Sequence, residues 1–299
     1  MAKKLKSQVS YRAVHVDGLE EDDIRKKEYL FQSVSYDPSG NVLGEMTHTP
    51  EGEIEHQSTY RYDEAGLVIE EILMESDELI SEHKTLEYDE HGRKVKEKLH
   101  YLDGSYDETL YSYDEAGSLT GMDTRSSDGE AGNTVVFEYN GSGLSAQREF
   151  DAEGELLSEK RFEHDESGNL VTESVGGTGD DFEMVYDYDA GGHRGMTRKY
   201  DPDGRLLERM TYIRDEQGRA TEVKEESSSG TELIKMEYDD RGNLLIQTAM
   251  SEDGSLISRV DRSYDEENRI LSTRVLFESR GQRPTQDYRI RFVYEYYPE

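Results

Sequence analysis

Histidines and carboxylates are the residues of this chain that could do chemistry. It has eight histidines, 68 Asp and Glu residues and no cysteine. Catalysis needs a few such groups at a spacing that breaks with the rest of the sequence. The histidines are scattered without H-E-x-x-H or similar ligand spacing, and carboxylates occur throughout, so no glycosidase-like pair stands out. We therefore predict that the protein is not an enzyme, and we expect no catalytic residue, no cofactor and no metal site.

One Gly-rich stretch resembles part of a metal-binding motif. Residues 176–181 read GGTGDD, which fits half of a calcium-binding nonapeptide. Such sites need stacked copies, and this one occurs once, so we interpret it as a hairpin loop. Weak calcium binding at acidic turns such as DPDG (201–204) stays open, because Ca²⁺ prefers carboxylate and carbonyl oxygens.

A series of evenly spaced tyrosines is the third feature that could take part in binding. The series consists of Tyr36, Tyr62, Tyr88, Tyr113, Tyr139, Tyr188, Tyr238 and Tyr264. Such rings could stack on sugars or peptides, but cross-strand aromatic pairs also stabilise sheets, and we favour the structural role. His164 occupies the tyrosine position of its own repeat, and we interpret it as a substituted member of the series.

The aromatic C-terminal stretch is a candidate for contact with a partner, and the concave face of the sheet is the alternative. Residues 291–297 read RFVYEYY, a strand that either closes the sheet or offers an edge to a partner strand. The candidate partner-binding residues are Tyr288, Phe292, Tyr294, Tyr296 and Tyr297.

A turn motif positions all of these residues. Tyr-Asp-x-x-Gly and its variants occur ten times, and successive copies end 24 to 26 residues apart, from Gly40 to Asn268. The last position is Gly nine times and Asn once, the types that best tolerate positive φ. Asp can hydrogen-bond its own backbone two residues on. These preferences predict a type I turn followed by a left-handed residue, which is a three-residue hairpin connection with a bulge.

A second, looser series of turns lies between the first, so each period holds two turns and two strands. Its members include TPEG (49–52), SDEL (76–79), DAEG (151–154), DPDG (201–204) and ESRG (278–281). The strands that lead into each Tyr alternate: Phe137 and Tyr139 share one face, and Glu138 lies between them. This period of two predicts one apolar and one acidic face.

The predicted fold is therefore all-β. It is an antiparallel sheet of β-hairpin repeats with about 20 strands, and the whole chain, residues 1–299, is one domain in which residues 1–7 are flexible. Open twisted sheets of this size curl or close, so we expect a spiral, a wide barrel or a flattened tube. No segment has a convincing helical period, and we interpret residues 18–29 mostly as a charged turn entering a strand.

The net charge of −33 restricts the partners. Binding to nucleic acid or to anionic membranes needs a basic face, so we expect neither. The charge favours a basic protein partner, and it also keeps exposed strands from pairing between molecules. The first residues lack the apolar run of a signal peptide, which predicts a cytoplasmic protein; a native leader that has been removed is the alternative.

The repeated motif resembles the YD repeat of Rhs proteins, the C components of Tc toxins and the teneurins. YDEAGLVIEE, YDDRGNLLIQ and HDESGNLVTE carry the resemblance, which covers about residues 30–275. It implies a sheet that spirals into a hollow shell. The Asp-Pro-x-Gly segments at 37–40 and 201–204 are far apart, and no toxin domain is recognisable, so self-cleavage and toxin delivery are not implied. We expect a non-catalytic scaffold or protein-binding module. The alternatives are a reduced shell or chaperone that encloses an effector, and an extracellular carbohydrate-binding protein.

Overall fold

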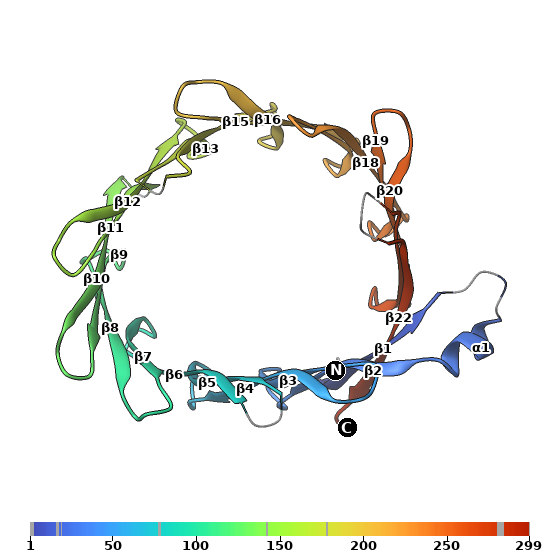
Figure 1. Ribbon diagram of the computed structural model, residues 1–299, viewed down its shortest axis with the longest axis horizontal. Coiled ribbons are helices and arrows are strands. Elements are labelled where there is room, and N and C mark those ends of the chain that lie inside the picture. The colour runs from blue at the N-terminus through green and yellow to red at the C-terminus, as the bar shows by residue number, and fades with distance from the viewer. Residues whose placement is uncertain are drawn as a thin grey trace. The chain divides into compact units, whose positions relative to one another are not determined.

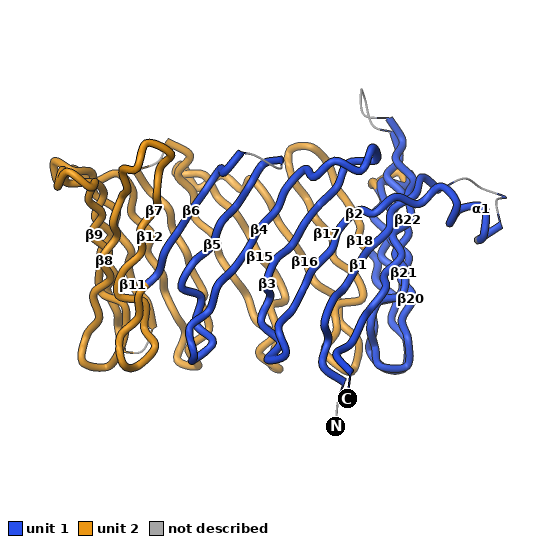
Figure 2. The backbone as a smooth tube through the Cα atoms, turned by 90° about the horizontal axis from the view of Figure 1, so that it is seen from below, with its two compact units in different colours: residues 1–86, 235–250, 254–299 blue, residues 87–234, 251–253 orange. Residues whose placement is uncertain are grey.

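The computed structural model describes residues 3–15, 18, 20–76, 79–141, 143–177, 179–279 and 284–298. Within these ranges there are 22 strands and one five-residue helix, so the predicted all-β hairpin repeat is confirmed (Figure 1). The turns predicted at 76–79, 176–181 and 278–281, and the motif copy that ends at Gly143, include residues outside these ranges. The chain divides into two compact units, which are described separately (Figure 2).

Unit 1 comprises residues 1–86, 235–250 and 254–299. Its strands are β1 (Leu5–Val14), β2 (Tyr29–Tyr36), β3 (Val42–His48), β4 (Ile54–Tyr62), β5 (Val68–Glu75), β19 (Leu244–Ser251), β20 (Leu256–Tyr264), β21 (Ile270–Phe277) and β22 (Gln286–Tyr296). Strands β6 (Leu79–Tyr88) and β18 (Gly230–Tyr238) cross the boundary between the units, and the last residue of β19, Ser251, belongs to unit 2. Antiparallel pairing runs from β19 through β22 to β1 and on to β6.

The first and last strands of the chain are neighbours in unit 1. β1 pairs with β2 on one side and with β22 on the other, and β22 also pairs with β21 (Figure 1). The C-terminal strand therefore closes the sheet at this point. It offers no free edge, so the alternative in which a partner strand adds to it is wrong. Residues 5–7, which we expected to be flexible, belong to β1.

One segment departs from the hairpin repeat. Between β1 and β2, where many other hairpins have a four-residue turn, the chain makes a longer excursion that contains helix α1 (Glu21–Arg25), which contacts β1 (Figure 1). The expectation of a charged turn was wrong for these five residues. Ile24 anchors the helix because its side chain is buried.

Unit 2 comprises residues 87–234 and 251–253. Its strands are β7 (Lys94–His100), β8 (Tyr106–Tyr113), β9 (Leu119–Ser126), β10 (Ala131–Asn140), β11 (Gly143–Phe150), β12 (Leu156–His164), β13 (Leu170–Gly176), β14 (Phe182–Tyr188), β15 (Arg194–Tyr200), β16 (Leu206–Arg214) and β17 (Ala220–Ser227). Each strand from β7 to β16 pairs antiparallel with the next one along the chain.

The turns have the predicted geometry. In the copy at Asp63, the Gly66 N–H donates to the Asp63 carbonyl at 3.1 Å, the Asp63 N–H donates to the Leu67 carbonyl at 2.9 Å, and Gly66 has φ +83°. The strand register shifts at Tyr62, which marks the bulge. Several turns of the second series have the same pattern of backbone hydrogen bonds, at 49–52, 101–104, 126–129, 151–154 and 201–204.

The sheet has little fully buried surface. The alternation is as predicted: the residues before the motif tyrosines that were expected to face solvent are all exposed, namely Glu87, Ser112, Glu138, Asp187 and Glu237. Among the described residues, the only buried apolar side chains are Ala13, Ile24, Val34, Ala146, Tyr186, Ala249 and Val275. Strands contact only their sheet neighbours, and α1 contacts only β1, so no second layer of described residues covers the sheet in either unit.

Candidate binding site

The repeated aspartates have a structural role. In the turn that begins at Asp37, the Oδ1 atom accepts backbone N–H bonds from Ser39 at 2.7 Å and from Asn41 at 2.9 Å. The backbone N–H of Asn41 is the main reason why the pKa of Asp37 lies below its usual value. The same pair of backbone bonds recurs in turns of both series, including those at Asp89, Asp165, Asp201, Asp239 and Asp265. These carboxylates accept hydrogen bonds from the backbone of their own turns.

The repeated tyrosines also have a structural role. The Tyr62 hydroxyl donates to the Val42 carbonyl at 2.7 Å, and Val42 is the first residue of β3 in the preceding hairpin. Equivalent bonds, each to the first carbonyl of a strand about 20 residues earlier, are made by Tyr113, Tyr139, Tyr188, Tyr264 and Tyr294. Each of these phenols therefore ties one hairpin to the hairpin before it.

Two substituted positions support this structural interpretation. Arg214 stands where other repeats have Tyr, and its guanidinium donates to the Arg194 carbonyl at 2.9 Å. Arg194 begins β15, so the acceptor is the same one that a tyrosine would reach. His164 lies over Gly143, where an added Cβ would come within 3.2 Å of its Nδ1. The tyrosine positions thus select for a hydrogen bond and for fit between hairpins.

The described residues contain no group of three or more His, Asp or Glu placed to hold a metal ion. His83 lies 2.9 Å from Glu70, His91 lies 3.7 Å from Glu90, and His193 lies 3.4 Å from Asp189, so each of these histidines lies beside a carboxylate. In the described part of the chain, no helix is long and apolar enough to cross a membrane.

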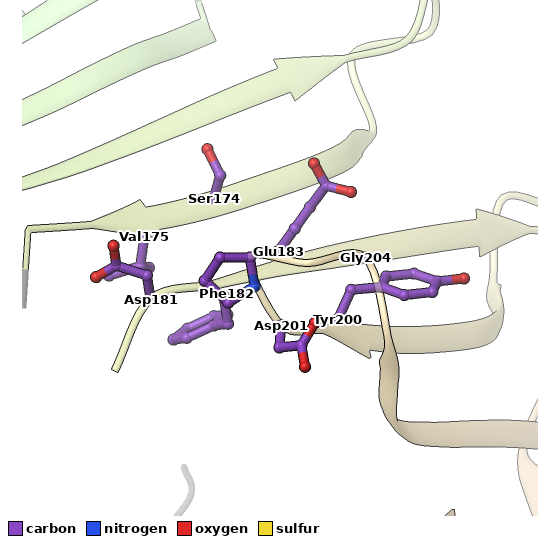
Figure 3. A pocket seen from close by; sticks show the side chains of 9 residues that line it. Ser174, Val175, Asp181, Phe182, Glu183, Tyr200, Asp201 and Gly204 are labelled. Atoms are coloured by element: carbon purple, nitrogen blue, oxygen red, sulfur yellow. The ribbon is translucent and has the colours of Figure 1, made fainter. Parts of the chain in front are cut away.

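A shallow groove beside the Gly-rich loop is shown in Figure 3. Phe182 and Tyr200 form its apolar part, and Asp181 and Asp201 lie nearby. The Asp201 carboxylate already accepts hydrogen bonds from the backbone of its turn. The Lys199 ammonium lies 4.3 Å from the centre of the Phe182 ring. Thr178, in the middle of the GGTGDD stretch, lies outside the described residues. This groove does not stand out as a site.

A more distinctive pocket lies in unit 1, beside the segment that departs from the repeat. It has a volume of about 650 Å³. We call it the β1–β22 pocket. Its lining includes Arg12, Lys27, Tyr29, Phe31, His48, Pro50, Glu55, Asp287 and Tyr288. It therefore combines basic and aromatic side chains in a strongly acidic molecule.

Strand register places the aromatic side chains of the pocket around Arg12. Arg12 of β1 lies opposite Tyr29 of β2 and opposite Ile290 of β22. The Arg12 guanidinium lies 3.9 Å from the centre of the Tyr288 ring and 5.4 Å from that of Phe31. Tyr29 and Phe31 contact each other edge to face, with ring centres 6.4 Å apart. The guanidinium is thus held between aromatic rings from both neighbouring strands.

The pocket has two cations without a carboxylate partner. Neither Arg12 nor Lys27 forms an ion pair with any described carboxylate. Of the two acidic residues in the lining, Glu55 is exposed and Asp287 is engaged elsewhere. Asp287 accepts two bonds from Arg274, which hold the pKa of that carboxyl below its usual value. The pocket therefore has a local excess of positive charge.

A second ion pair fixes the excursion to the sheet. Glu28, just before β2, forms a bidentate pair with Arg291 of β22, with distances from 2.6 to 3.0 Å. The Glu28 side chain is only 9% exposed, and Arg291 also lies 4.6 Å from the centre of the Tyr11 ring. Register alternation puts Tyr11 and Arg291 on the face opposite to Arg12. The Glu28–Arg291 pair therefore holds the strands of the pocket together from the opposite face of the sheet.

The five residues predicted to bind a partner do not form one group. Only Tyr288 lines the β1–β22 pocket. Phe292 shares the strand face of Tyr288 by alternation. Tyr294 and Tyr297 donate to the carbonyls of Ile270 and Tyr36, and Tyr296 lies 5.2 Å from the Arg269 guanidinium. Partner binding by this set stays a prediction.

Sequence reasoning missed the other side of the pocket. Arg12, Lys27, Tyr29 and Phe31 come from the two ends of the excursion between β1 and β2. The available signal was the long interval before the first motif copy, where a charged stretch replaces a turn. The pairing of β1 with β22 was the missing fact, because it brings Tyr288 to residues about 260 to 275 positions earlier in the chain.

Among the comparisons with known proteins, a family model agrees with the repeat. The model of the Teneurin YD-shell family matches residues 20–257. No curated protein matches the chain. Among solved structures, a complex of TcdB2, TccC3 and Cdc42 is 12% identical, with 94% of this chain and 20% of that chain covered and a TM-score of 0.32. This chain thus spans about a fifth of that one.

Two further solved structures show a similar level of likeness. The Photorhabdus luminescens Tc holotoxin pore with a mutation in TccC3 is 15% identical, with 92% of this chain and 17% of that chain covered and a TM-score of 0.36. A porin-like protein from Bacteroides uniformis is 12% identical, with 98% and 99% covered and a TM-score of 0.32. The sequence resemblance to YD repeats is confirmed by the family match, and the chain belongs to the Teneurin YD-shell family.

Proposed function

We propose that this chain is a non-catalytic protein-binding domain. The observation that carries the proposal is that apolar side chains of the sheet are exposed. No second layer of described residues covers it, yet large apolar side chains line its strands, including Leu43, Leu79, Leu156, Leu206 and Leu271, which are all at least 42% exposed. A partner that covers these side chains would remove apolar surface from water, which is the main favourable term in most protein association.

The state of the polar groups supports a non-catalytic role. Turn aspartates accept backbone hydrogen bonds, and motif tyrosines donate to backbone carbonyls. A nucleophile or general base has to be free to approach a substrate, whereas these groups are committed to the fold. The net charge of −33 favours a basic client at long range.

The experiment is capture from the native host with the full chain, followed by reconstitution with the purified partner. Hydrogen–deuterium exchange then maps the contact. We expect a saturable complex that protects strand residues and that Leu156→Asp and Leu206→Asp weaken. Leu102→Asp, at an 80% exposed turn position, is the matched control. If no protein is recovered and a glycan array gives a reproducible hit, carbohydrate binding replaces this proposal.

A second candidate is a shell or chaperone that encloses an effector, and family membership favours it. The same exchange experiment separates the two. A docked partner protects one patch of neighbouring strands. An enclosed effector protects one face of many strands in both units from exchange. The effector itself resists added protease while it is bound.

A further inference from the structure

We propose that the β1–β22 pocket binds a peptide segment of a protein partner in which a carboxylate stands next to an aromatic or aliphatic side chain. This inference rests on the proposed protein-binding function, and it adds a site and its chemistry. Two features of the pocket lead to it, an anion-binding part and an apolar part.

The anion-binding part consists of Arg12 and Lys27. Arg12 lies between the rings of Phe31 and Tyr288, which restrict the positions its side chain can take. Its side chain makes no hydrogen bond to a described residue. A guanidinium has five N–H donors in a planar fork that matches a carboxylate. Because these rings restrict its rotamers in advance, less conformational entropy is lost when an anion binds.

Lys27 adds a second positive charge to the lining of the pocket. It is exposed and has no carboxylate partner among the described residues, whereas its neighbour Lys26 pairs with Asp23 at 2.7 Å. Of the nearby acids, Asp287 is paired with Arg274 and Glu28 with Arg291. Glu55 remains, exposed at the rim. The local balance of charge therefore favours an anion, opposite to the molecule as a whole.

The apolar part consists of Tyr29, Phe31, Tyr288 and Pro50. Aromatic side chains are enriched where interfaces are most buried, and they contact both rings and aliphatic groups well. The apolar surface lies directly beside the Arg12 guanidinium. A ligand with both a carboxylate and an apolar group a few bonds away would use both parts together, and a peptide segment supplies this combination.

The place of the pocket in the repeat supports a specific role. It forms where the chain departs from the four-residue turns and inserts α1 between two strands. In repeat proteins such insertions are often on the binding face. The Glu28–Arg291 pair, 263 residues apart in sequence, holds the insertion against β22, so the pocket is formed before a ligand arrives.

The test uses the full chain and three blocked peptides, acetyl-Glu-Phe-Glu-amide, acetyl-Gln-Phe-Gln-amide and acetyl-Glu-Ala-Glu-amide. Dissociation constants come from titrations followed by NMR. We expect the first peptide to bind at least about tenfold more tightly than either of the others, because only it engages both parts of the pocket. Equal binding of the first two peptides, or no binding of any peptide, overturns the inference.

Variants locate the binding. Lys27→Gln and Arg12→Gln should each weaken binding of the first peptide by at least about fivefold. Lys27 is exposed, so its variant tests the pocket even if Arg12→Gln loses stability in a thermal melt. Lys199→Gln is the matched control in unit 2, since that ammonium also lies over an aromatic ring and forms no ion pair with a described carboxylate. Equal losses of peptide affinity in the control and the pocket variants contradict the assignment. Displacement of the peptide by a short oligothymidylate also contradicts it, because the pocket would then bind a nucleic acid.

The partner experiment separates this inference from the proposed function. If the intact chain captures a protein and Lys27→Gln captures it equally well, the pocket is not the site, and the protein-binding function stands. If no protein is captured while the peptide still binds selectively, the pocket has the proposed chemistry, and the broader function fails.

Discussion

At the scale of single residues, the turns depend on positive φ. Gly66 and Gly242 have φ of +83° and +90°. We expect Gly66→Val and Gly242→Val each to lower the free energy of unfolding by roughly 1–3 kcal/mol, because a β-branched residue is strained there. An added Cβ at Gly66 would meet only Asn41, at 3.9 Å, so the cost comes from the backbone. Denaturant titration of the purified variants measures it.

Gly195→Val is the control, because Gly195 lies within a strand, lacks positive φ and has no atom within 3.7 Å of an added Cβ. Asn268→Gly should be neutral or mildly stabilising: it relieves φ of +61° but removes the bond that Asn243 donates to Asn268. Equal stability of all these variants would show that the turn geometry is unimportant.

The hydrogen bonds of the tyrosines make a second prediction at this scale. Tyr188→Phe removes the donor to the Leu170 carbonyl, which lies 2.8 Å from the hydroxyl. We expect a loss of about 1 kcal/mol of stability, the usual size for one hydrogen bond. Tyr101→Phe removes a hydroxyl that pairs with Asp107 on a side chain that is 45% exposed, so it should have little effect in the same chemical denaturation experiment. Equal losses would mean that the tyrosine series acts through ring packing alone.

At the scale of elements, the repeated parts of the fold could be predicted and the exceptions could not. The position of Gly or Asn at the end of each motif is a local backbone requirement, so it can be read from the sequence. The Tyr62–Val42 bond is not local, since it joins residues of successive hairpins about 20 positions apart. Helix α1 was missed because five residues are too few to show a helical period.

The candidate site was harder to predict than the fold, because it depends on the pairing of β1 with β22. The apolar register of residues 291–297 was compatible with either closure or a free edge. Arg12 gained significance only from its place between Tyr288 and Phe31. Contacts between the two ends of a chain leave no trace in a period of about 25 residues.

The double pairing of β22 makes a prediction for the whole element. A chain that ends before Gln286 loses the hydrogen bonds of β22 to both β1 and β21, and it exposes two strand edges. We expect either aggregation, which light scattering would detect, or a broad, less cooperative thermal transition, which circular dichroism would detect. Removing only Pro298 and Glu299 leaves β22 intact and should change neither. A truncated chain that melts as cooperatively as the full one would contradict the role of β22 in closing the sheet.

At the scale of the whole molecule, charge and the turn aspartates act in opposite directions as pH falls. The net charge of −33 at pH 7 produces self-repulsion, which weakens as pH approaches the isoelectric point of about 4.5. In the turns, backbone N–H groups lower the pKa values of Asp37, Asp89 and Asp189. A lowered pKa gives stability that is present above the ordinary value, near 4, and is lost as pH falls through the folded-state pKa.

These two effects predict that thermal stability is highest at mildly acidic pH, between about 4.5 and 6. It should fall towards pH 7 because repulsion grows, and fall below pH 4 because the turn carboxylates become protonated. Melts at pH 7 should rise with added salt, whereas melts near pH 4.5 should respond little, since salt screens charge repulsion. Asp37→Asn keeps an oxygen acceptor for both backbone N–H groups but does not titrate, so it should reduce the loss below pH 4. A melting temperature that is highest at pH 7 to 8 and independent of salt would show that repulsion among the acidic side chains is negligible, and that the acidic surface limits association between molecules without weakening the fold.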